Sequence, residues 1–110
     1  LKAAALKHAA GQFLLPSAAA SAAFLANQPV KDNGLVSIAW AKAVPGGYNA
    51  SLITYAVVNT GKARAKGAAT KAFIQYVLKS CVPANAAKLG YVALAGGQST
   101  KADALTNLIK

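Results

Sequence analysis

The sequence predicts an α/β fold in which a small sheet is flanked by helices. Residues 48–59 read YNASLITYAVVN, and the centre of this run is apolar at both odd and even positions, as in a strand covered on both faces. Residues 68–79 then repeat apolar positions at helical spacing, and a short segment at 91–94 follows. A strand, a helix and a further extended segment in this order are typical of α/β proteins.

The length of 110 residues predicts a single domain over 1–110, or a fragment of a longer protein. The apolar share is 55%, but 28 of those residues are alanine, which buries little area. Because hydrophobic stabilisation scales with buried apolar area, the core is expected to be thin. We therefore expect a covering segment or an oligomer partner.

Two helices are predicted near the beginning of the chain. Residues 1–10 carry apolar side chains at helical spacing, and Gly11 follows as a C-terminal stop. A second helix begins at Pro16-Ser17, where Ser17 caps the helix or Pro16 occupies its first turn. Phe24 and Leu25 would then face the core.

The stretch between His8 and Lys31 contains no charged residue and is long enough to span a membrane. It also contains glutamine, asparagine, serine and proline, and most of the rest is alanine. A helix of a soluble protein is the better interpretation.

Turns are predicted at 28–34, which contains Asn33-Gly34, and at 45–47. Residues 35–40 are apolar but short, so a strand and a helical turn both remain open. Residues 60–67 form a polar loop that leads into the helix 68–79.

The helix over 68–79 is predicted to have two faces. Its apolar stripe consists of Phe73, Ile74, Val77 and Leu78, and its polar side of Lys71, Gln75 and Lys79.

Val82-Pro83 is expected to end this helix, and 84–89 form a short helix that ends at Gly90. A last helix spans 101–110, with Leu105, Leu108 and Ile109 facing inward. Thr100 and Asp103 have the spacing of a capping box, with Asp in the place of Glu.

The net charge is +10, because twelve Lys and Arg residues face only Asp32 and Asp103. Such a charge attracts polyanions or phosphate, or it forms a solvated basic surface that keeps the chain in solution. The basic residues are spread along the chain, and the one local cluster is Lys62, Arg64 and Lys66. A single Arg, with no aromatic residues interleaved among the basic ones, argues against specific nucleic-acid recognition.

Residues that carry catalytic chemistry are sparse. Asp32 and Asp103 are the only acidic residues, His8 is the only histidine, and Cys81 is the only cysteine. These exclude a disulfide within the chain and leave too few ligands for a typical metal site. We expect no catalytic residue, no metal and no cofactor, and hence no enzyme.

Glycine-rich segments offer one further candidate site. Residues 96–100, GGQST, precede the predicted last helix, where free N–H groups favour an anion. A glycine-rich turn with a capping Thr explains the same residues. Gly61-Lys62 is not a phosphate-binding loop, because the upstream Gly and the following Ser or Thr are missing.

Four segments together resemble a known family: FLLPSAAASAAFLAN, YNASLITYAVVN, AATKAFIQYVLKS and NAAKLGYVALAGGQSTKADALTNLIK. In this order they are similar to the C-terminal part of the phosphate-binding proteins of ABC-type phosphate transporters. The resemblance implies a partial type II periplasmic-binding-protein fold. It covers nearly the whole chain here, but a minor part of a typical family member.

Two departures from the family pattern concern proline. The chain has Tyr48-Asn49 where the family usually has Tyr-Pro, and Ala93-Leu94-Ala95 where it usually has Pro-Leu-Pro. Without these prolines two turns lose a fixed φ angle.

The family's phosphate ligands come from its N-terminal and middle parts, none of which is matched here. The resemblance therefore leaves the ligand-binding residues unknown. It implies that the missing N-terminal and middle segments of the same protein, or an oligomer partner, complete the site.

The sequence thus predicts a non-enzymatic solute-binding domain for phosphate or a related anion in ABC-type uptake. Its expected partners are the anion and, if the full family role holds, a transporter permease, and its expected location is extracellular or in the cell envelope. The alternative is a basic cell-surface interaction module that binds polyanions or a protein partner.

Overall fold

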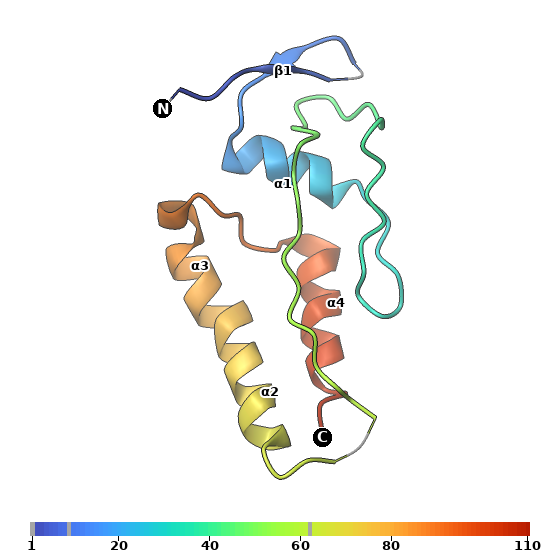
Figure 1. Cartoon of the computed structure of the whole chain (residues 1–110), viewed down its shortest axis with the longest axis vertical. Helices are drawn as coiled ribbons and strands as arrows, with labels where there is room; N and C mark the ends of the chain where they lie inside the picture. The colour runs from blue at the N-terminus through green and yellow to red at the C-terminus, as the bar shows by residue number, and fades with distance from the viewer. Residues whose placement is uncertain (1, 9, 62) are drawn as a thin grey trace. The chain divides into compact units, whose positions relative to one another are not determined.

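The computed structural model describes residues 2–8, 10–61 and 63–110. The chain divides into two compact units, unit 1 (Leu1–Ile53) and unit 2 (Thr54–Lys110) (Figure 1). The described residues form helices in both units and a small antiparallel sheet in unit 1. This mixture of helices and strands agrees with the predicted α/β class at a coarse level.

Unit 1 begins with a short hairpin of β1 (Leu6–Lys7) and β2 (Phe13–Leu14). Leu6 lies opposite Leu14, and Gly11 has a φ of 83° in the connecting turn. The prediction of a helix over 1–10 is therefore wrong for the described residues. A ten-residue helix is marginal in water by itself, and the cross-strand apolar pair offers an alternative.

Helix α1 (Ala18–Ala26) confirms the predicted second helix. Ser17 is its N-cap, and the Ser17 hydroxyl accepts a hydrogen bond from the backbone N–H of Ala20 at 3.1 Å. Phe24 is fully buried and Leu25 is 8% exposed, as predicted. They form the core of unit 1 together with Val44, against which Ile38 and Ile53 pack.

The chain after α1 folds back on itself through the predicted turn. Asn33 Oδ1 accepts a hydrogen bond from Leu35 N at 3.1 Å, and Gly34 has a φ of 85°. The ambiguous segment 35–40 forms an isolated antiparallel bridge, Val30 with Val36, rather than a helical turn or a full strand. The predicted turn at 45–47 is closed by a hydrogen bond from Gly47 N to Val44 O at 2.8 Å.

The predicted buried strand over 48–59 is wrong. These residues belong to no strand, and Leu52 and Val57 are 79% and 96% exposed. The chain passes from unit 1 to unit 2 between Ile53 and Thr54, inside this segment. An extended segment becomes a strand only by pairing with a neighbour, and the hairpin of unit 1 uses other residues.

Unit 2 contains a long helical run beside a single helix (Figure 1). The run consists of α2 (Gly67–Tyr76), the π-helical turn η1 (Val77–Cys81), α3 (Val82–Asn85) and the 3₁₀ turn η2 (Ala86–Leu89). Gly90 ends it in the left-handed conformation, as predicted. Lys62, in the predicted loop before α2, lies outside the described residues.

Val82-Pro83 does not end the helix. Proline normally breaks a helix because it lacks an N–H and its ring meets the carbonyl four residues earlier. Here the chain widens first, since Val82 N–H bonds to Val77 O across five residues. The π-helical turn resets the hydrogen-bond register, and Pro83 sits in the first turn of α3, where its missing N–H is tolerated.

Helix α4 (Gly96–Thr106) begins earlier than the predicted helix over 101–110. Its N-cap is Ala95, which makes no side-chain capping bond, and Thr100 lies inside the helix. The predicted capping box of Thr100 and Asp103 is therefore wrong. Of the three side chains predicted to face inward, Ile109 is buried, Leu105 is half-buried and Leu108 is 52% exposed.

The two faces predicted for the 68–79 helix are observed only in part, because two side chains of the polar side contact α4. Gln75 Nε2 donates to Thr106 Oγ1 at 3.0 Å, and Lys79 Nζ lies 2.8 Å from Asp103 Oδ1. On the predicted apolar stripe, Phe73 is 63% exposed, while Ile74, Val77 and Leu78 are half-buried. Among the described residues of unit 2, the buried apolar side chains are Ala86 and Ile109, so its core is thin.

Candidate functional site

The candidate site is a groove in unit 1, called here the hairpin groove. Its residues come from the β1–β2 hairpin and from the segment 40–50. The groove has a volume of about 410 Å³. Its lining includes Leu6, Lys7, His8, Leu14, Trp40 and Tyr48.

The hairpin supplies one wall of the groove. The register places Leu6 opposite Leu14, and both line the groove. The turn is closed by hydrogen bonds from His8 N to Gln12 O at 3.0 Å and from Gly11 N to His8 O at 2.8 Å. Lys7 follows Leu6 directly and is exposed.

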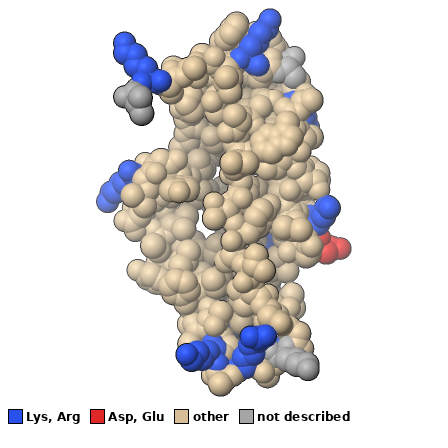
Figure 2. Space-filling model, viewed as in Figure 1, with Lys and Arg blue, Asp and Glu red and all other residues tan. Residues whose placement is uncertain are grey.

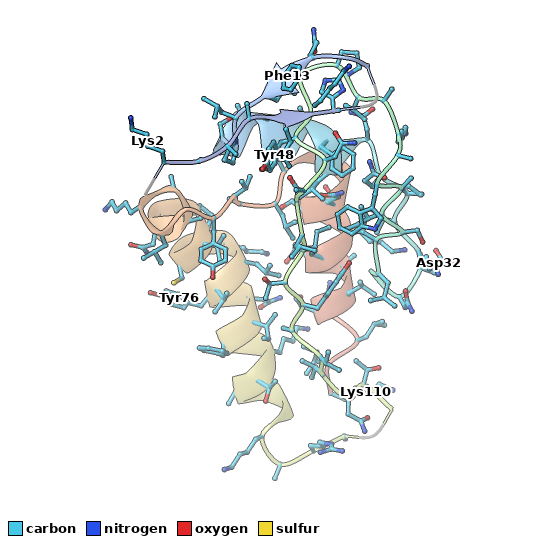
Figure 3. The ribbon with its side chains drawn as sticks, turned by 45° about the horizontal axis from the view of Figure 1, so that its top comes forward. Lys2, Phe13, Asp32, Tyr48, Tyr76 and Lys110 are labelled. Carbon is cyan, nitrogen blue, oxygen red and sulfur yellow. The ribbon has the colours of Figure 1, made fainter. Side chains whose placement is uncertain are left out.

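The segment 40–50 supplies the other wall and is held by several hydrogen bonds. Tyr48 N donates to Ala20 O of α1 at 2.9 Å, and Figure 3 shows Tyr48 beside α1 and beneath the hairpin. Asn49 Nδ2 donates to Trp40 O at 2.6 Å. A Cβ on Gly47 would lie 3.0 Å from Val44 Cβ, so a glycine fits tightly here.

His8 is 6% exposed, and both of its ring nitrogens are used within the hairpin. Nδ1 accepts a hydrogen bond from Ala10 N at 2.9 Å, and Nε2 lies 3.2 Å from Gln12 Oε1. Since Nδ1 is an acceptor, Nε2 carries the hydrogen and donates it to Gln12. Both ring nitrogens of His8 therefore take part in hydrogen bonds that hold the turn of the hairpin.

The acidic residues are separated between the units. Asp32 belongs to unit 1, and Asp103 belongs to unit 2, where it pairs with Lys79. Neither unit therefore contains two acidic side chains for acid-base chemistry.

Cys81 is a half-buried free thiol at the end of η1. Within 2–8, 10–61 and 63–110, no group of three or more His, Cys, Asp or Glu residues lies together as metal ligands would.

The predicted glycine-rich candidate over 96–100 forms the first turn of α4. Its N–H groups have no side-chain cap, but Thr100 Oγ1 turns back to Gly96 O at 3.3 Å. The Gly96–Thr100 segment is thus the first turn of α4 and not a loop ahead of the helix.

Exposed basic side chains occur in both units. On the face shown in Figure 2, Lys and Arg side chains lie at several separate places, and acidic side-chain atoms are also visible. Of the predicted cluster, Arg64 and Lys66 are exposed in the loop before α2, and Lys62 lies outside the described residues. This distribution is typical of a basic surface in water.

No helix in the described part of the chain has both the length and the apolar character needed to cross a membrane. Comparison with protein-family models, curated proteins and solved structures finds no significant match to this chain. The resemblance to phosphate-binding proteins therefore stays a prediction.

Sequence reasoning missed the hairpin groove because its residues are far apart in the chain. The predicted helix over 1–10 places His8 on a helix rather than in a hairpin. Trp40 is the last residue of the segment 35–40, for which the sequence leaves a strand and a helical turn both open. The signal was the concentration of aromatic and amide residues within 40–50, which contain Trp40, Tyr48 and Asn49.

Proposed function

We propose that this chain is a non-enzymatic domain of the solute-binding type that captures phosphate or a related small anion. It acts in ABC-type uptake with a transporter permease, outside the cytoplasm or in the cell envelope. Its partial periplasmic-binding-protein-like fold is completed, and the anion site with it, by further segments of the same protein or by an oligomer partner.

The observation that carries this proposal is the exposure of apolar side chains within residues 52–57. The segment is rich in β-branched and aromatic residues, which favour strands, yet Leu52, Tyr55 and Val57 are 79%, 42% and 96% exposed. An exposed apolar segment of this kind is unusual on the surface of a monomeric protein. It is typical of a segment that another structural element covers. It is also the segment that resembles the central strand of the phosphate-binding proteins.

The thin cores of both units support the same proposal. In unit 1 the core cluster contains Phe24, Leu25 and Val44, whereas large apolar side chains such as Phe73, Leu89 and Tyr91 of unit 2 are more than half exposed. Such a distribution is expected of a scaffold whose apolar faces lie against other parts of a larger protein.

The charge supports an anionic ligand. A net charge of +10 raises the local concentration of anions and their association rate, and this effect weakens as salt increases. In the part of the chain that the structure describes, no group of three or more His, Cys, Asp or Glu residues lies together as a cation site would require.

The test is calorimetric titration of the full product of the gene with phosphate at near-physiological salt. The proposal predicts saturable binding at one site per chain, with sulfate and chloride as controls. Absence of saturable phosphate binding by the full product would overturn it. Retention on heparin that falls steeply with salt, without phosphate binding, would instead assign the chain to basic cell-surface interaction modules.

A further inference from the structure

We propose that the hairpin groove binds a small neutral aromatic compound that carries a hydroxyl or N–H group, with its ring against Trp40 and its donor directed at Asn49 Oδ1. This ligand differs from phosphate, and its binding does not depend on the solute-binding role.

The size and the lining of the groove favour an organic ligand. Its volume of about 410 Å³ lies within the range of about 300–1,000 Å³ that is usual for small-molecule sites. A phosphate ion is far smaller and needs hydrogen-bond partners for the oxygens that it buries, which a largely apolar lining does not provide.

The aromatic side chains favour a planar ring. Trp40 is 50% exposed and Tyr48 is half-buried, and both line the groove with Leu6 and Leu14. Tryptophan and tyrosine prefer offset-stacked or edge-to-face contacts with another ring. A flat aromatic ligand therefore matches these side chains better than a sugar, which needs several polar partners.

The register of the hairpin favours a neutral ligand. Lys7 is the one Lys, Arg, Asp or Glu residue among the described residues of the lining. Side chains alternate between the two faces of a hairpin, so Leu6 and Leu14 share one face, and Lys7 shares the other face with Phe13. Phe13 is 69% exposed and lies outside the lining, so the ammonium group of Lys7 is directed away from the face that carries the two leucines. An anion in the groove would lack a cationic partner, and burying an unpaired charge is costly.

Asn49 supplies the polar group that selects a hydrogen-bond donor. Its Nδ2 donates to Trp40 O at 2.6 Å, which identifies the other amide atom, Oδ1, as the acceptor. Oδ1 is buried and has no hydrogen-bond partner among the described residues. A buried acceptor without a partner costs free energy, and an O–H or N–H group of a ligand that reaches it removes this cost. A carboxylate carries acceptors only and would be repelled.

Contact with Oδ1 requires a small movement of side chains, because this atom has almost no exposed surface in the free chain. The backbone of this wall is held by bonds from Tyr48 N to Ala20 O at 2.9 Å and from Gly47 N to Val44 O at 2.8 Å. Trp40 is half exposed, so its ring has room to turn. A change of side-chain rotamer over a fixed backbone is common when partners bind.

The experiment is an NMR titration of the isotope-labelled chain with phenol, which is neutral at about pH 7 and carries one donor. The proposal predicts saturable shifts of the signals of the Trp40 indole N–H and of the Asn49 side-chain amide. The expected Kd is on the order of 1–10 mM, because phenol has only about seven non-hydrogen atoms. Excess inorganic phosphate should leave the bound fraction unchanged, which separates this site from the proposed anion site.

Anisole, in which a methyl group replaces the hydroxyl hydrogen of phenol, tests the contact with Asn49. In the wild type, phenol should shift the Asn49 side-chain amide further than anisole does. In Asn49→Leu, the affinity for phenol relative to that for anisole should fall about two- to tenfold, the contribution of one hydrogen bond. Comparing two ligands in one variant cancels a general change of the groove. Asn27→Leu removes an exposed amide of unit 1 outside the lining and should keep the wild-type ratio of affinities.

Trp40→Leu tests the ring contact. Trp40 is half exposed, so this variant is expected to fold, and circular dichroism checks that it does. Its affinity for phenol and for anisole should fall severalfold. Benzoate, an anion of similar shape, should bind the wild type severalfold more weakly than phenol does.

Five results would each overturn the proposal. Two concern the wild type with phenol and anisole: phenol gives no saturable shift, or both ligands shift the Asn49 amide equally. Two concern the variants: Asn49→Leu keeps the wild-type ratio of affinities, or Trp40→Leu binds phenol as well as the wild type does. The last is benzoate binding as tight as that of phenol, which would contradict the neutral class of ligand.

Discussion

Gln28 connects the end of α1 to the segment that carries Trp40, so its replacement should weaken unit 1. Its side chain is buried at 4% exposure. Nε2 donates to Phe24 O at 3.1 Å, and Oε1 accepts from Ala39 N at 2.9 Å. Gln28→Met keeps the length of the side chain and removes both bonds.

The expected loss follows from these two bonds. Phe24 O keeps a second donor, Asn27 N at 3.3 Å, and Ala39 is an exposed residue whose N–H water can reach. Neither group is left fully unpaired, so each bond counts at its net value of about 0.5–1.5 kcal/mol. Gln28→Met should therefore lower the free energy of unfolding of unit 1 by about 2 kcal/mol, the sum for two such bonds.

Urea unfolding followed by Trp40 fluorescence measures this loss, because Trp40 adjoins Ala39. With a slope of about 1–2 kcal/mol per molar urea, the midpoint should fall by about 1–2 M. Asn27→Ala is the control, since it removes an exposed bond from Asn27 Nδ2 to Ala23 O and should change stability by less than about 0.5 kcal/mol. Equal midpoints for Gln28→Met and the control would refute the reasoning.

Three further predictions concern the helices. Ser17→Ala removes the side-chain cap of α1 and should lower the free energy of unfolding of unit 1 by about 1 kcal/mol, measured by the same urea unfolding. An unchanged urea midpoint would show that the hydrogen bond from Ala20 N to Ser17 Oγ does not stabilise unit 1. Gly67→Ala places a Cβ against the backbone carbonyl of Lys110 and should lower the melting temperature of unit 2, followed by circular dichroism. In the control Gly97→Ala the added Cβ meets open space within a helix, so the melting temperature should rise slightly. Equal shifts of the melting temperature in the two variants would contradict the close approach of Gly67 to Lys110. Thr106 is 3% exposed, and its hydroxyl accepts a hydrogen bond from Gln75 Nε2 and donates one to Asp103 O. Thr106→Val removes both bonds and should lower the free energy of unfolding by about 1–2 kcal/mol, measured by the same method. A stability equal to that of the wild type would contradict this.

Local signals in the sequence predicted some elements correctly. A hydroxyl before an alanine-rich run satisfies a free N–H of the first turn, which predicts the cap at Ser17. Glycine adopts the left-handed conformation without strain, which predicts the helix end at Gly90, whose φ is 76°. Both features depend on neighbouring residues only.

Features that depend on distant partners were not predictable in the same way. The segment over 48–59 has strand composition, but a strand requires a neighbouring strand, and the described chain provides none there. In place of the predicted helix over 1–10, residues 6–7 pair with residues 13–14 in a hairpin. Pro83 is accommodated by a π-helical turn, which the spacing of apolar residues does not indicate. The hairpin groove depends on two contacts between residues that are distant in the sequence, the pairing in the hairpin and the hydrogen bond from Asn49 Nδ2 to Trp40 O. For this reason local sequence signals did not predict it.

Amide hydrogen exchange of residues 52–58 tests most directly the claim that this chain is a scaffold covered by other parts of a larger protein. It is measured in the 110-residue chain and in the full product of the gene under the same conditions. The account predicts that protection of these amides is low in the former and rises by a factor of about 100 or more in the latter, as the segment joins a sheet. Equal and low protection in both would contradict it.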